Sequence, residues 1–290
     1  MKIKFVIFFL FISAFATAQV QIFNLKPFQK ATLSDTLKET SGLTVFENRL
    51  FTINDSGNLA EIYEINPDSG TILKTYKTNV ENIDWESITH DEENFYIGDF
   101  GNNLGTRRDL YIYKIPFVED SLNLNNIQKI NFLYPEQTEF IPRNINNNFD
   151  GEAMIYLNGK LHIFTKEWKS KKVTHYTIDP EISDLQEAQK VEEFPSGFVV
   201  TDAGYYEEKL YLVGYNKKME IYLLEFYDFS DDKFFNGKYK KYFLGMSTRF
   251  GQVEGLATSP EGIFLSNEEF HKFIFHVKQS LYFIPYKDLK

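Results

Sequence analysis

The sequence predicts an all-β fold built from repeated units, and three observations lead to this prediction. The chain contains 29 Phe and 18 Tyr residues, which gather with β-branched residues in short alternating stretches typical of strands. Beyond the N-terminal segment, we find no stretch with the i, i+3, i+4, i+7 apolar spacing of an amphipathic helix. A short pattern also recurs at intervals of about fifty residues, which indicates a repeat architecture.

The recurring pattern is an acidic residue followed by a small and an apolar residue, then a turn and an apolar stretch that ends in a polar residue. The acidic residues of the five copies are Glu39, Glu86, Glu152, Asp202 and Glu254. The polar residues that end the five apolar stretches are Asp55, Asp99, Lys166, Asn216 and Asn267. Successive acids are 47, 66, 50 and 52 residues apart. Four short strands in each such step are typical of the blades of a β-propeller.

The third and fourth strands of each repeat follow in order. With their turns, they are predicted at 61–70 and 71–78, 109–116 and 129–135, 173–180 and 188–194, and 220–229 and 238–245. The long step between the second and third repeats contains residues 135–148, which lack a further acid and apolar stretch. We therefore predict an insertion there and a ring of five blades with four antiparallel strands each. A six-bladed ring is the alternative.

The two ends of the chain are expected to close the ring together. The fifth repeat has a strand at 280–286 and then ends one strand short, whereas residues 20–28 precede the first repeat without a partner. Unpaired strand edges are a liability that a closed ring removes. The N-terminal strand, at 20–28, is therefore predicted to complete the last blade.

The extreme N-terminus is typical of a secretory signal peptide. Lys2 and Lys4 precede an apolar run at 5–15, and residues 16–18 (Ala-Thr-Ala) match the small-x-small pattern of a cleavage site. We expect residues 1–18 to be removed by cleavage near Ala18, which leaves 19–290 as a single propeller domain, secreted or periplasmic. No later apolar run is long enough for a membrane span. The chain has no Cys, which excludes disulfides, lipid attachment through a thiol, and thiolate zinc sites.

The charge of the chain limits its partners. After cleavage, 41 acidic and 29 basic residues remain, so the mature net charge is −12. A protein this acidic does not follow a phosphate backbone or an anionic membrane surface by general electrostatics. The expected partners are therefore a small molecule, a glycan or a protein, with no nucleic acid, and the expected state is a monomer.

The repeat places its polar residues at one end of the channel. The innermost strand of each blade lines the channel, and the second strand runs antiparallel and returns to the same rim. The predicted rim therefore combines the five acids with the five polar ends. We assign ligand binding to Asp55, Glu86, Asp99, Glu152, Lys166, Glu254 and Asn267. Asp84 and Asp150 lie two residues before their Glu partners and are placed on the outer wall.

Crowded acids of this kind suggest a bound cation. Two carboxylates ~6 Å apart repel each other by roughly 3 kcal/mol at an effective dielectric of ~20, and Lys166 alone does not offset a ring of them. Oxygen ligands without Cys favour Ca²⁺ or Mg²⁺, and the sequence predicts Ca²⁺. In the competing interpretation, the acids accept hydrogen bonds from backbone amides between blades. Lys166 has two interpretations as well, one in which it balances the ring's charge and one in which it orients an anionic substrate.

Longer motifs connect the chain to known propellers. The sequences ETSGL (39–43), FTINDSGN (51–58), DWESI (84–88), YIGDFGNN (96–103), DGEAM (150–154) and QVEGLA (252–257) resemble a group of mostly uncharacterised secreted bacterial β-propeller proteins. More distantly, the chain looks like the propellers of phytase-like esterases and gluconolactonases. That resemblance implies a metal at the channel mouth and, by motif position, Glu39, Asp202 and Asn216 as its ligands. The rim lacks the Lys and Arg cluster that phytate would require, so the resemblance does not extend to phytate hydrolysis.

Two functions remain open from the sequence. The first is a secreted binding module with an acidic, calcium-binding mouth. The second is a metal-dependent hydrolase of a lactone or ester, in which the cation polarises a carbonyl and a rim carboxylate acts as base. The sequence does not decide whether the protein is an enzyme. Motifs for serine hydrolases, zinc peptidases and nucleotide-binding loops are absent from it.

Overall fold

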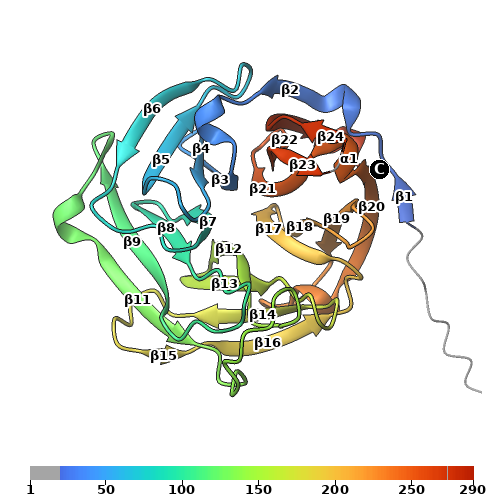
Figure 1. Cartoon of the computed structure of the whole chain (residues 1–290). Coiled ribbons are helices and arrows are strands. Elements are labelled where there is room, and N and C mark those ends of the chain that lie inside the picture. The colour runs from blue at the N-terminus through green and yellow to red at the C-terminus, as the bar shows by residue number, and fades with distance from the viewer. Residues whose placement is uncertain (1–19, 273) are drawn as a thin grey trace, which may run out of the picture.

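The computed structural model of the protein describes residues 20–272 and 274–290, and it is a five-bladed β-propeller. Five sheets are arranged as blades around a common axis, as Figure 1 shows. The predicted fold class is therefore confirmed, and the six-bladed alternative is wrong. The predicted signal peptide, residues 1–18, lies outside the described residues. Within the described part of the chain, the helices are all too short to cross a membrane.

Each blade begins with its innermost strand. Blade one contains β3 (Thr40–Phe46), β4 (Arg49–Asn54), β5 (Glu61–Ile65) and β6 (Ile72–Lys77). Blade two contains β7 (Trp85–His90), β8 (Asn94–Asp99), β9 (Leu110–Val118) and β11 (Gln128–Leu133), with β10 (Ser121–Leu122) beside β9. Blade three contains β12 (Gly151–Leu157), β13 (Lys160–Thr165), β14 (Val173–Ile178) and β16 (Gln189–Phe194).

The last two blades take up strands from the N-terminus. Blade four contains β17 (Val199–Tyr206), β18 (Lys209–Tyr215), β19 (Glu220–Tyr227) and β20 (Lys238–Met246), with β1 (Val20–Ile22) as a fifth strand. Blade five contains β21 (Gln252–Thr258), β22 (Gly262–Glu268), β25 (Ser280–Pro285) and β2 (Gln29–Thr32). A separate hairpin of β23 (Phe270–Lys272) and β24 (Phe275–Val277) is inserted between β22 and β25.

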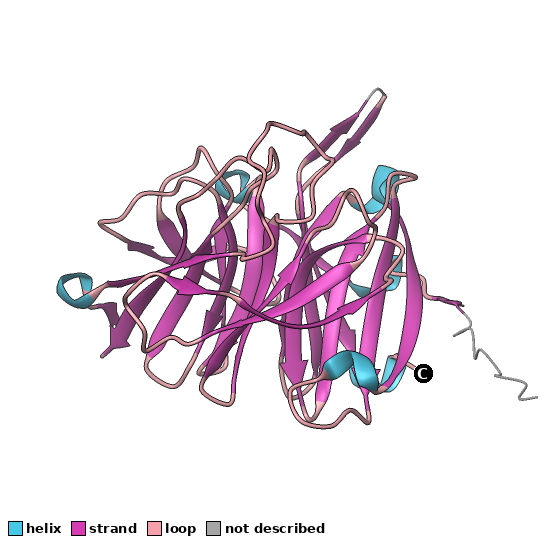
Figure 2. Ribbon diagram, turned by 90° about the horizontal axis from the view of Figure 1, so that it is seen from below, coloured by secondary structure: helices cyan, strands magenta, loops and turns pink. Residues whose placement is uncertain are grey.

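Short elements connect these strands. β15 (Gln186–Glu187) leaves blade three and pairs in parallel with β11 of blade two. The single α-turn in the described chain, α1 (Ser247–Phe250), precedes β21. The 3₁₀ turns are η1 (Lys26–Phe28), η2 (Asp35–Leu37), η3 (Leu124–Asn126), η4 (Phe234–Asn236) and η5 (Tyr286–Asp288). Viewed from the side, the blades form a thick disc from which one hairpin projects (Figure 2).

The N-terminal segment closes the ring, but through residues other than those predicted. β2 pairs antiparallel with β25, with Ala31 opposite Leu281. β1 instead pairs in parallel with β20, at the outer edge of blade four. The assignment of 20–28 to the last blade is therefore wrong. Leu25, fully buried in a cluster shared by blades four and five, lies where the segment passes from one edge to the other.

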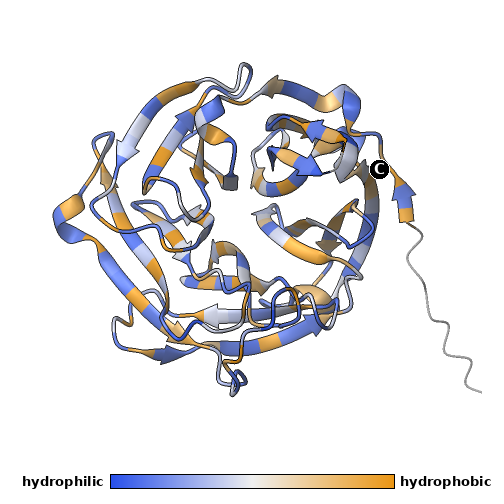
Figure 3. Cartoon of the chain, in the orientation of Figure 1, coloured by the Kyte–Doolittle hydropathy of each residue, from blue (hydrophilic) through white to orange (hydrophobic). Residues whose placement is uncertain are grey.

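Burial follows the layer of each strand. The innermost and second strands are buried on both faces: β3 is buried at six of its seven residues and β8 at all six. The outer strands alternate, as in β6, where exposed residues separate partly buried ones. Figure 3 shows this alternation of hydrophilic and hydrophobic residues along the outer strands. Apolar clusters fill the spaces between neighbouring blades, which is how a propeller buries its strands.

The predicted insertion is confirmed as a loop without strands, at residues 134–150. It is tied to the 102–105 loop of blade two. The Gln137 side chain donates to the Gly105 carbonyl at 3.0 Å, and the Arg143 amide donates to the Leu104 carbonyl at 2.8 Å. The loop leads directly into β12, so it lies at the end of the molecule where the innermost strands begin. These bonds hold it there.

Candidate functional site at the channel mouth

Every innermost strand carries a β-bulge near its start. In each pair of first and second strands, one residue of the first strand has no partner in the register. These residues are Gly42, Glu86, Glu152, Thr201 and Glu254 in blades one to five. A bulge adds one residue and re-aims its side chain. The fold therefore presents three carboxylates at equivalent places, from blades two, three and five.

The repeat alignment made from the sequence is correct for these three blades and shifted in the other two. In blade one the bulge residue is Gly42, with φ of 74°, and Glu39 lies three residues earlier. In blade four the bulge residue is Thr201, and Asp202 follows it. A one-residue shift along a strand turns a side chain to a different direction. Glu39 and Asp202 therefore do not occupy the position of Glu86.

Two of these carboxylates, Glu86 and Glu254, line a cavity of about 240 Å³, which we call the mouth. Its polar wall consists of Ser41, Asp55, Glu86, Asn103, Lys166, Tyr215, Gln252, Glu254 and Glu268, and Ile145 and Trp168 add apolar surface. Of the predicted rim residues, the structure thus brings Asp55, Glu86, Lys166 and Glu254 to one cavity. Ile145 belongs to the insertion, so this loop forms part of the wall.

Three carboxylates lie very close together beside the mouth, and two of them, Asp55 and Glu86, line it. One oxygen from each of Asp55, Asp84 and Glu86 lies within 4.8 Å of the others, and we call this set the acidic triad. Glu86 is 5% exposed, and within the described chain no side chain or amide donates a hydrogen bond to its carboxylate. Burial and the neighbouring acids raise the pKa of Glu86 well above its usual value, and burial raises the pKa of Asp84 to about 6.

A glycine keeps the space beside the triad open. A methyl group on Gly101 would lie 2.4 Å from Asp84 Oδ2 and 2.5 Å from Glu86 Oε1, well inside van der Waals contact. Any larger residue would fill the space next to these two oxygens. The chain therefore leaves room beside two acids of the triad, without a side chain of its own to occupy it.

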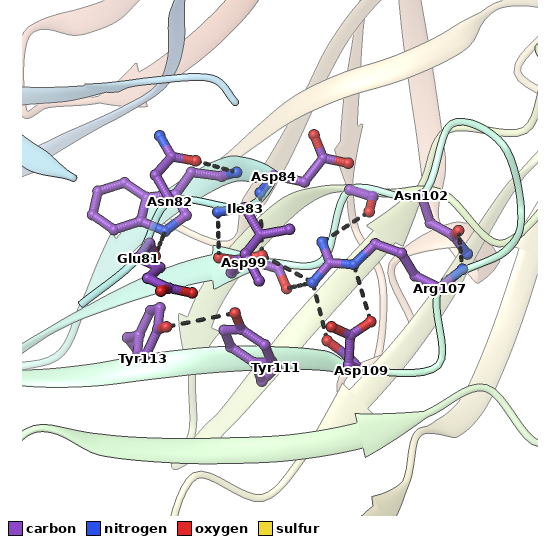
Figure 4. A network of polar contacts seen from close by, with 12 residues as sticks. Glu81, Asn82, Ile83, Asp84, Asp99, Asn102, Arg107, Asp109, Tyr111 and Tyr113 are labelled. Atoms are coloured by element: carbon purple, nitrogen blue, oxygen red, sulfur yellow. Dashed lines mark hydrogen bonds and ion pairs between the residues drawn. The ribbon is translucent and has the colours of Figure 1, made fainter. Parts of the chain in front are cut away.

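Asp84 is held in place from behind. The Asp99 carboxylate accepts the Ile83 amide at 3.0 Å and the Asp84 amide at 3.2 Å, and Arg107 Nη2 lies 3.0 Å from Asp99 Oδ1. Figure 4 shows this network, with the Asp84 carboxylate pointing away from it. Asp99 is fully buried. It supports the triad from the second strand of blade two and does not line the mouth.

Lys166 is the basic residue among the acids that line the mouth. Its Nζ lies 2.9 Å from Glu152 Oε2, and both side chains are buried. Burial alone would lower the pKa of Lys166, but Glu152, Tyr215, Glu254 and Glu86 together raise it well above its usual value. The second oxygen of Glu152 has no hydrogen-bond partner among the described residues. This arrangement supports charge balance as a role for Lys166.

The opposite wall is a hydrogen-bonded set from blades four and five. Tyr215 donates to Glu254 Oε1 at 3.0 Å, and Gln252 Nε2 donates to Glu254 Oε1 at 3.3 Å and to Glu268 Oε1 at 2.6 Å. Burial raises the pKa of Glu254, and burial together with Glu254 raises the pKa of Glu268. Asn267 lies behind this wall, where its amide donates to the carbonyls of Glu268 and Lys278.

The three residues that the family resemblance implied as metal ligands lie in different surroundings. Glu39 is exposed and accepts a hydrogen bond from Asn58 at 2.7 Å. Asp202 accepts the amides of Leu43, Ala203 and Leu256. Asn216 accepts the amides of Lys218 and Glu220 and so caps its own turn. None of these three residues lines the mouth cavity; the acids that line it are Asp55, Glu86, Glu254 and Glu268.

Sequence reasoning missed several mouth residues and misplaced one. Asp84, predicted on the outer wall, belongs to the triad. It lies just before β7, and the bulge at Glu86 interrupts the alternation of that strand, so the two-residue spacing does not by itself bring the two side chains together. Asp150, also predicted outside, is fully buried, and its carboxylate accepts the Asn102 amide at 2.6 Å. Tyr215, Gln252 and Glu268 lie within two residues of the predicted rim residues Asn216, Glu254 and Asn267 but were not assigned to the site.

Some solved protein structures are similar to this chain, but no known protein family matches it. No model of a known protein family matches this chain, and no curated protein sequence matches it. A Thermus thermophilus protein, provisionally assigned as an oxidoreductase (glucose dehydrogenase), is similar at 10% identity with a TM-score of 0.48, over 88% of this chain and 98% of that one. A provisionally assigned 6-phosphogluconolactonase from Bacteroides uniformis is similar at 10% identity with a TM-score of 0.37, over 82% and 64%. Likenesses this distant carry no argument about activity.

Proposed function

We propose that the protein is a binding module whose mouth holds one hard divalent cation, Ca²⁺, at the acidic triad. Asp55, Asp84 and Glu86 supply the oxygen ligands. The ligand's own oxygen atoms or water complete the coordination shell, since Ca²⁺ takes about six to eight oxygens. The bound partner is a small molecule, a glycan or a protein segment that reaches into the cavity. The expected signal peptide places this activity outside the cytoplasm.

The Glu86 carboxylate is the observation that supports this proposal most directly. Glu86 is 5% exposed and has two further acids beside it, and burial together with neighbouring acids raises its pKa well above its usual value, so ionising all three acids without a cation is costly. Lys166 is already paired with Glu152. A cation between the three oxygens removes the cost, and the space beside Gly101 gives it room.

The type of ligand atoms selects the cation. The triad offers carboxylate oxygens alone, and the mouth contains neither His nor Cys among its lining residues. Such a set suits Ca²⁺ and Mg²⁺ better than zinc or copper. Ca²⁺ tolerates irregular geometry, whereas Mg²⁺ demands a near-ideal octahedron. Three acids on two blades, with the other positions left to ligand and water, favour Ca²⁺.

Metal-dependent hydrolysis of a lactone or ester is a second function, favoured by a separate observation. Glu254 and Glu268 have raised pKa values on the wall opposite the triad, and a base works best when its pKa lies near the working pH. The cation would polarise a carbonyl, and one of these carboxylates would take a proton from the attacking water. Tyr215 would then orient Glu254 through their hydrogen bond.

The test is a thermal melt with Ca²⁺ and with chelator. If Ca²⁺ binds the folded state alone, a concentration of ~100 times Kd stabilises the protein by about 2.7 kcal/mol, or a rise in Tm of roughly 5–10 °C for a chain of this size. Glu86→Gln removes most of this rise. The matched control is Glu39→Gln, a carboxylate of blade one that lies exposed beside Asn58, and this variant keeps it.

Each outcome decides between the proposals. Equal melting curves in Ca²⁺ and in chelator would reject the metal site. Hydrolysis of a lactone panel that depends on Ca²⁺ and is lost in Glu254→Gln or Glu268→Gln would establish the hydrolase. Ca²⁺-dependent stabilisation without turnover would leave the binding module as the function.

A further inference from the structure

A second group of metal-ligating side chains lies on the β23–β24 hairpin. His271 and His276 are direct cross-strand partners, and their rings stack with centroids 3.8 Å apart at an interplanar angle of 24°. Glu269 lies just before the hairpin. The two histidines show no metal-binding spacing in the sequence, so the pairing of β23 with β24 creates this group.

The three side chains already converge on one point. Glu269 Oε1 lies 3.0 Å from His276 Nε2 and 3.6 Å from His271 Nε2, and the ligand atoms of all three lie within 4.8 Å of one another. A tetrahedral Zn²⁺ at its usual distance of ~2.0–2.1 Å from each ligand holds donor atoms roughly 3.3 Å apart. The observed separations therefore bracket the spacing that a zinc ion requires.

We propose that Glu269, His271 and His276 form a binding site for one transition-metal ion of the Zn²⁺ type. Two imidazoles and one carboxylate suit Zn²⁺, Ni²⁺ or Cu²⁺, whereas the oxygen-only triad of the mouth does not. Three protein ligands leave a fourth tetrahedral position for water or for an atom of a partner. The site is independent of the proposed calcium site in both residues and ligand chemistry.

Contacts outside the group fix Glu269 and keep one of its oxygens available. The Glu269 amide donates to the Lys38 carbonyl at 2.6 Å, which anchors it to the segment before blade one. Lys38 Nζ lies 3.5 Å from Oε2, whereas the imidazoles face Oε1. The His271 and His276 side chains are 62% and 48% exposed, which gives an ion access from solvent.

The position of the hairpin connects this site to the mouth. Glu268 lines the mouth cavity, and the hairpin begins two residues later, at Phe270. The hairpin stands clear of the disc in Figure 2. A metal ion held there lies at the rim of the mouth, with its open position accessible to a molecule that approaches the cavity.

The proposal is tested by calorimetric titration of the full chain with Zn²⁺, together with Co²⁺ absorption, which reports tetrahedral coordination. The expected result is one ion per chain. Losing a partner of a metal ligand typically weakens binding about 10–100-fold, so losing a ligand itself, in His271→Ala or in His276→Ala, is expected to weaken binding roughly 100-fold. Glu269→Gln weakens binding as well, because the neutral amide is a poor ligand.

Two controls separate this site from the rest of the chain. Lys272→Ala changes a neighbouring position of β23 that alternates to the other face and keeps the affinity of the unmodified protein. Glu86→Gln alters the acidic triad and keeps the Zn²⁺ affinity too, even where it abolishes the response to Ca²⁺. Absence of Zn²⁺ binding to the unmodified protein would overturn the proposal, and so would unchanged affinity in both His variants.

Discussion

Two buried carboxylates of the innermost strands, Asp202 and Glu86, have opposite surroundings. Asp202 is 1% exposed and accepts three backbone amides: Ala203 at 2.9 Å, Leu256 at 2.6 Å and Leu43 at 3.3 Å. Glu86 is 5% exposed and accepts no hydrogen bond from the described residues. The amides around Asp202 belong to blades four, five and one, so this side chain joins the two ends of the ring.

The bulge explains the difference. Glu86 is the bulge residue of β7, and Asp202 lies one place beyond the bulge residue of β17. One position is enough to turn the carboxylate of Asp202 toward the amides of the neighbouring blades and that of Glu86 toward the mouth. The acid ring therefore divides: Asp202 binds backbone amides of neighbouring blades, whereas Glu86 belongs to the proposed ligand site. A repeated residue type does not imply a repeated role.

Asp202→Ala should cause the largest loss of stability. The substitution leaves three buried amides without their acceptor, and each unsatisfied group costs about 1–3 kcal/mol, so we expect a loss of about 3–9 kcal/mol in the free energy of unfolding. Denaturant titration measures it. Because the effect is architectural, Ca²⁺ does not rescue it; a variant that regained its stability in Ca²⁺ would place Asp202 with the ligand residues instead.

The second prediction concerns pH in the presence of chelator. Burial raises the pKa of Asp84 to about 6 and that of Asp150 to about 7, whereas unfolded carboxyls titrate near pH ~4. The folded state therefore binds more protons between these values, and stability falls as the pH rises from about 4 through about 7. A pKa shift of about two units corresponds to roughly 2–3 kcal/mol. Melting temperatures across this range, with and without Ca²⁺, measure the effect.

Added Ca²⁺ should flatten this profile at its upper end, because the cation favours the ionised triad. The contribution of Asp150, which accepts the Asn102 amide, lies outside the triad and persists. If the Tm instead stayed constant from about pH 4 to about pH 8 in chelator, the crowded acids would not destabilise the fold, and the contrast between Glu86 and Asp202 would lose its energetic basis.

A third prediction tests whether the space beside the acidic triad matters when its charges are unchanged. Gly101→Ala adds a methyl group 2.4 Å from an oxygen of Asp84 and 2.5 Å from an oxygen of Glu86, so the carboxylates must move apart while every charge stays. We expect Ca²⁺ to bind about tenfold more weakly or worse, which corresponds to about 1.4 kcal/mol. Calorimetric titration with Ca²⁺ gives the affinity. Unchanged affinity would move the cation away from this side of the mouth.

The smallest effect is expected at the bulge of blade four. Thr201 donates through Oγ1 to the Val253 carbonyl at 2.7 Å, and Thr201→Val replaces this group by a methyl of similar size. The loss of one hydrogen bond costs about 1 kcal/mol, with no change in the response to Ca²⁺. A lost calcium response in this variant would show that blade four takes part in the site after all.

The fold was predictable because its signals are local. Alternating apolar residues, turn residues and a repeat near fifty residues lie within single stretches of the chain, and the main strands of each blade come from one such stretch, with β1 and β2 added to blades four and five. The sequence correctly predicted that an N-terminal strand closes the ring, but it assigned the wrong residues to that strand. Residues 20–22 and 29–32 both form strands, and two open edges, of blades four and five, were available to them. Leu25, between these two strands, packs between those blades, a contact that no local pattern contains.

For the site, the sequence by itself determined which carboxylates belong to the repeat, because residue type and spacing are written in the chain. It thereby placed Asp55, Glu86, Lys166 and Glu254 at one end of the channel, where the structure has them. Only the tertiary structure decided their roles. Whether a carboxylate meets amides, a lysine or another carboxylate depends on one-residue bulges and on the neighbouring blade. Asp84 joined the triad, and His271 came to face His276, through pairings between strands that no linear spacing specifies.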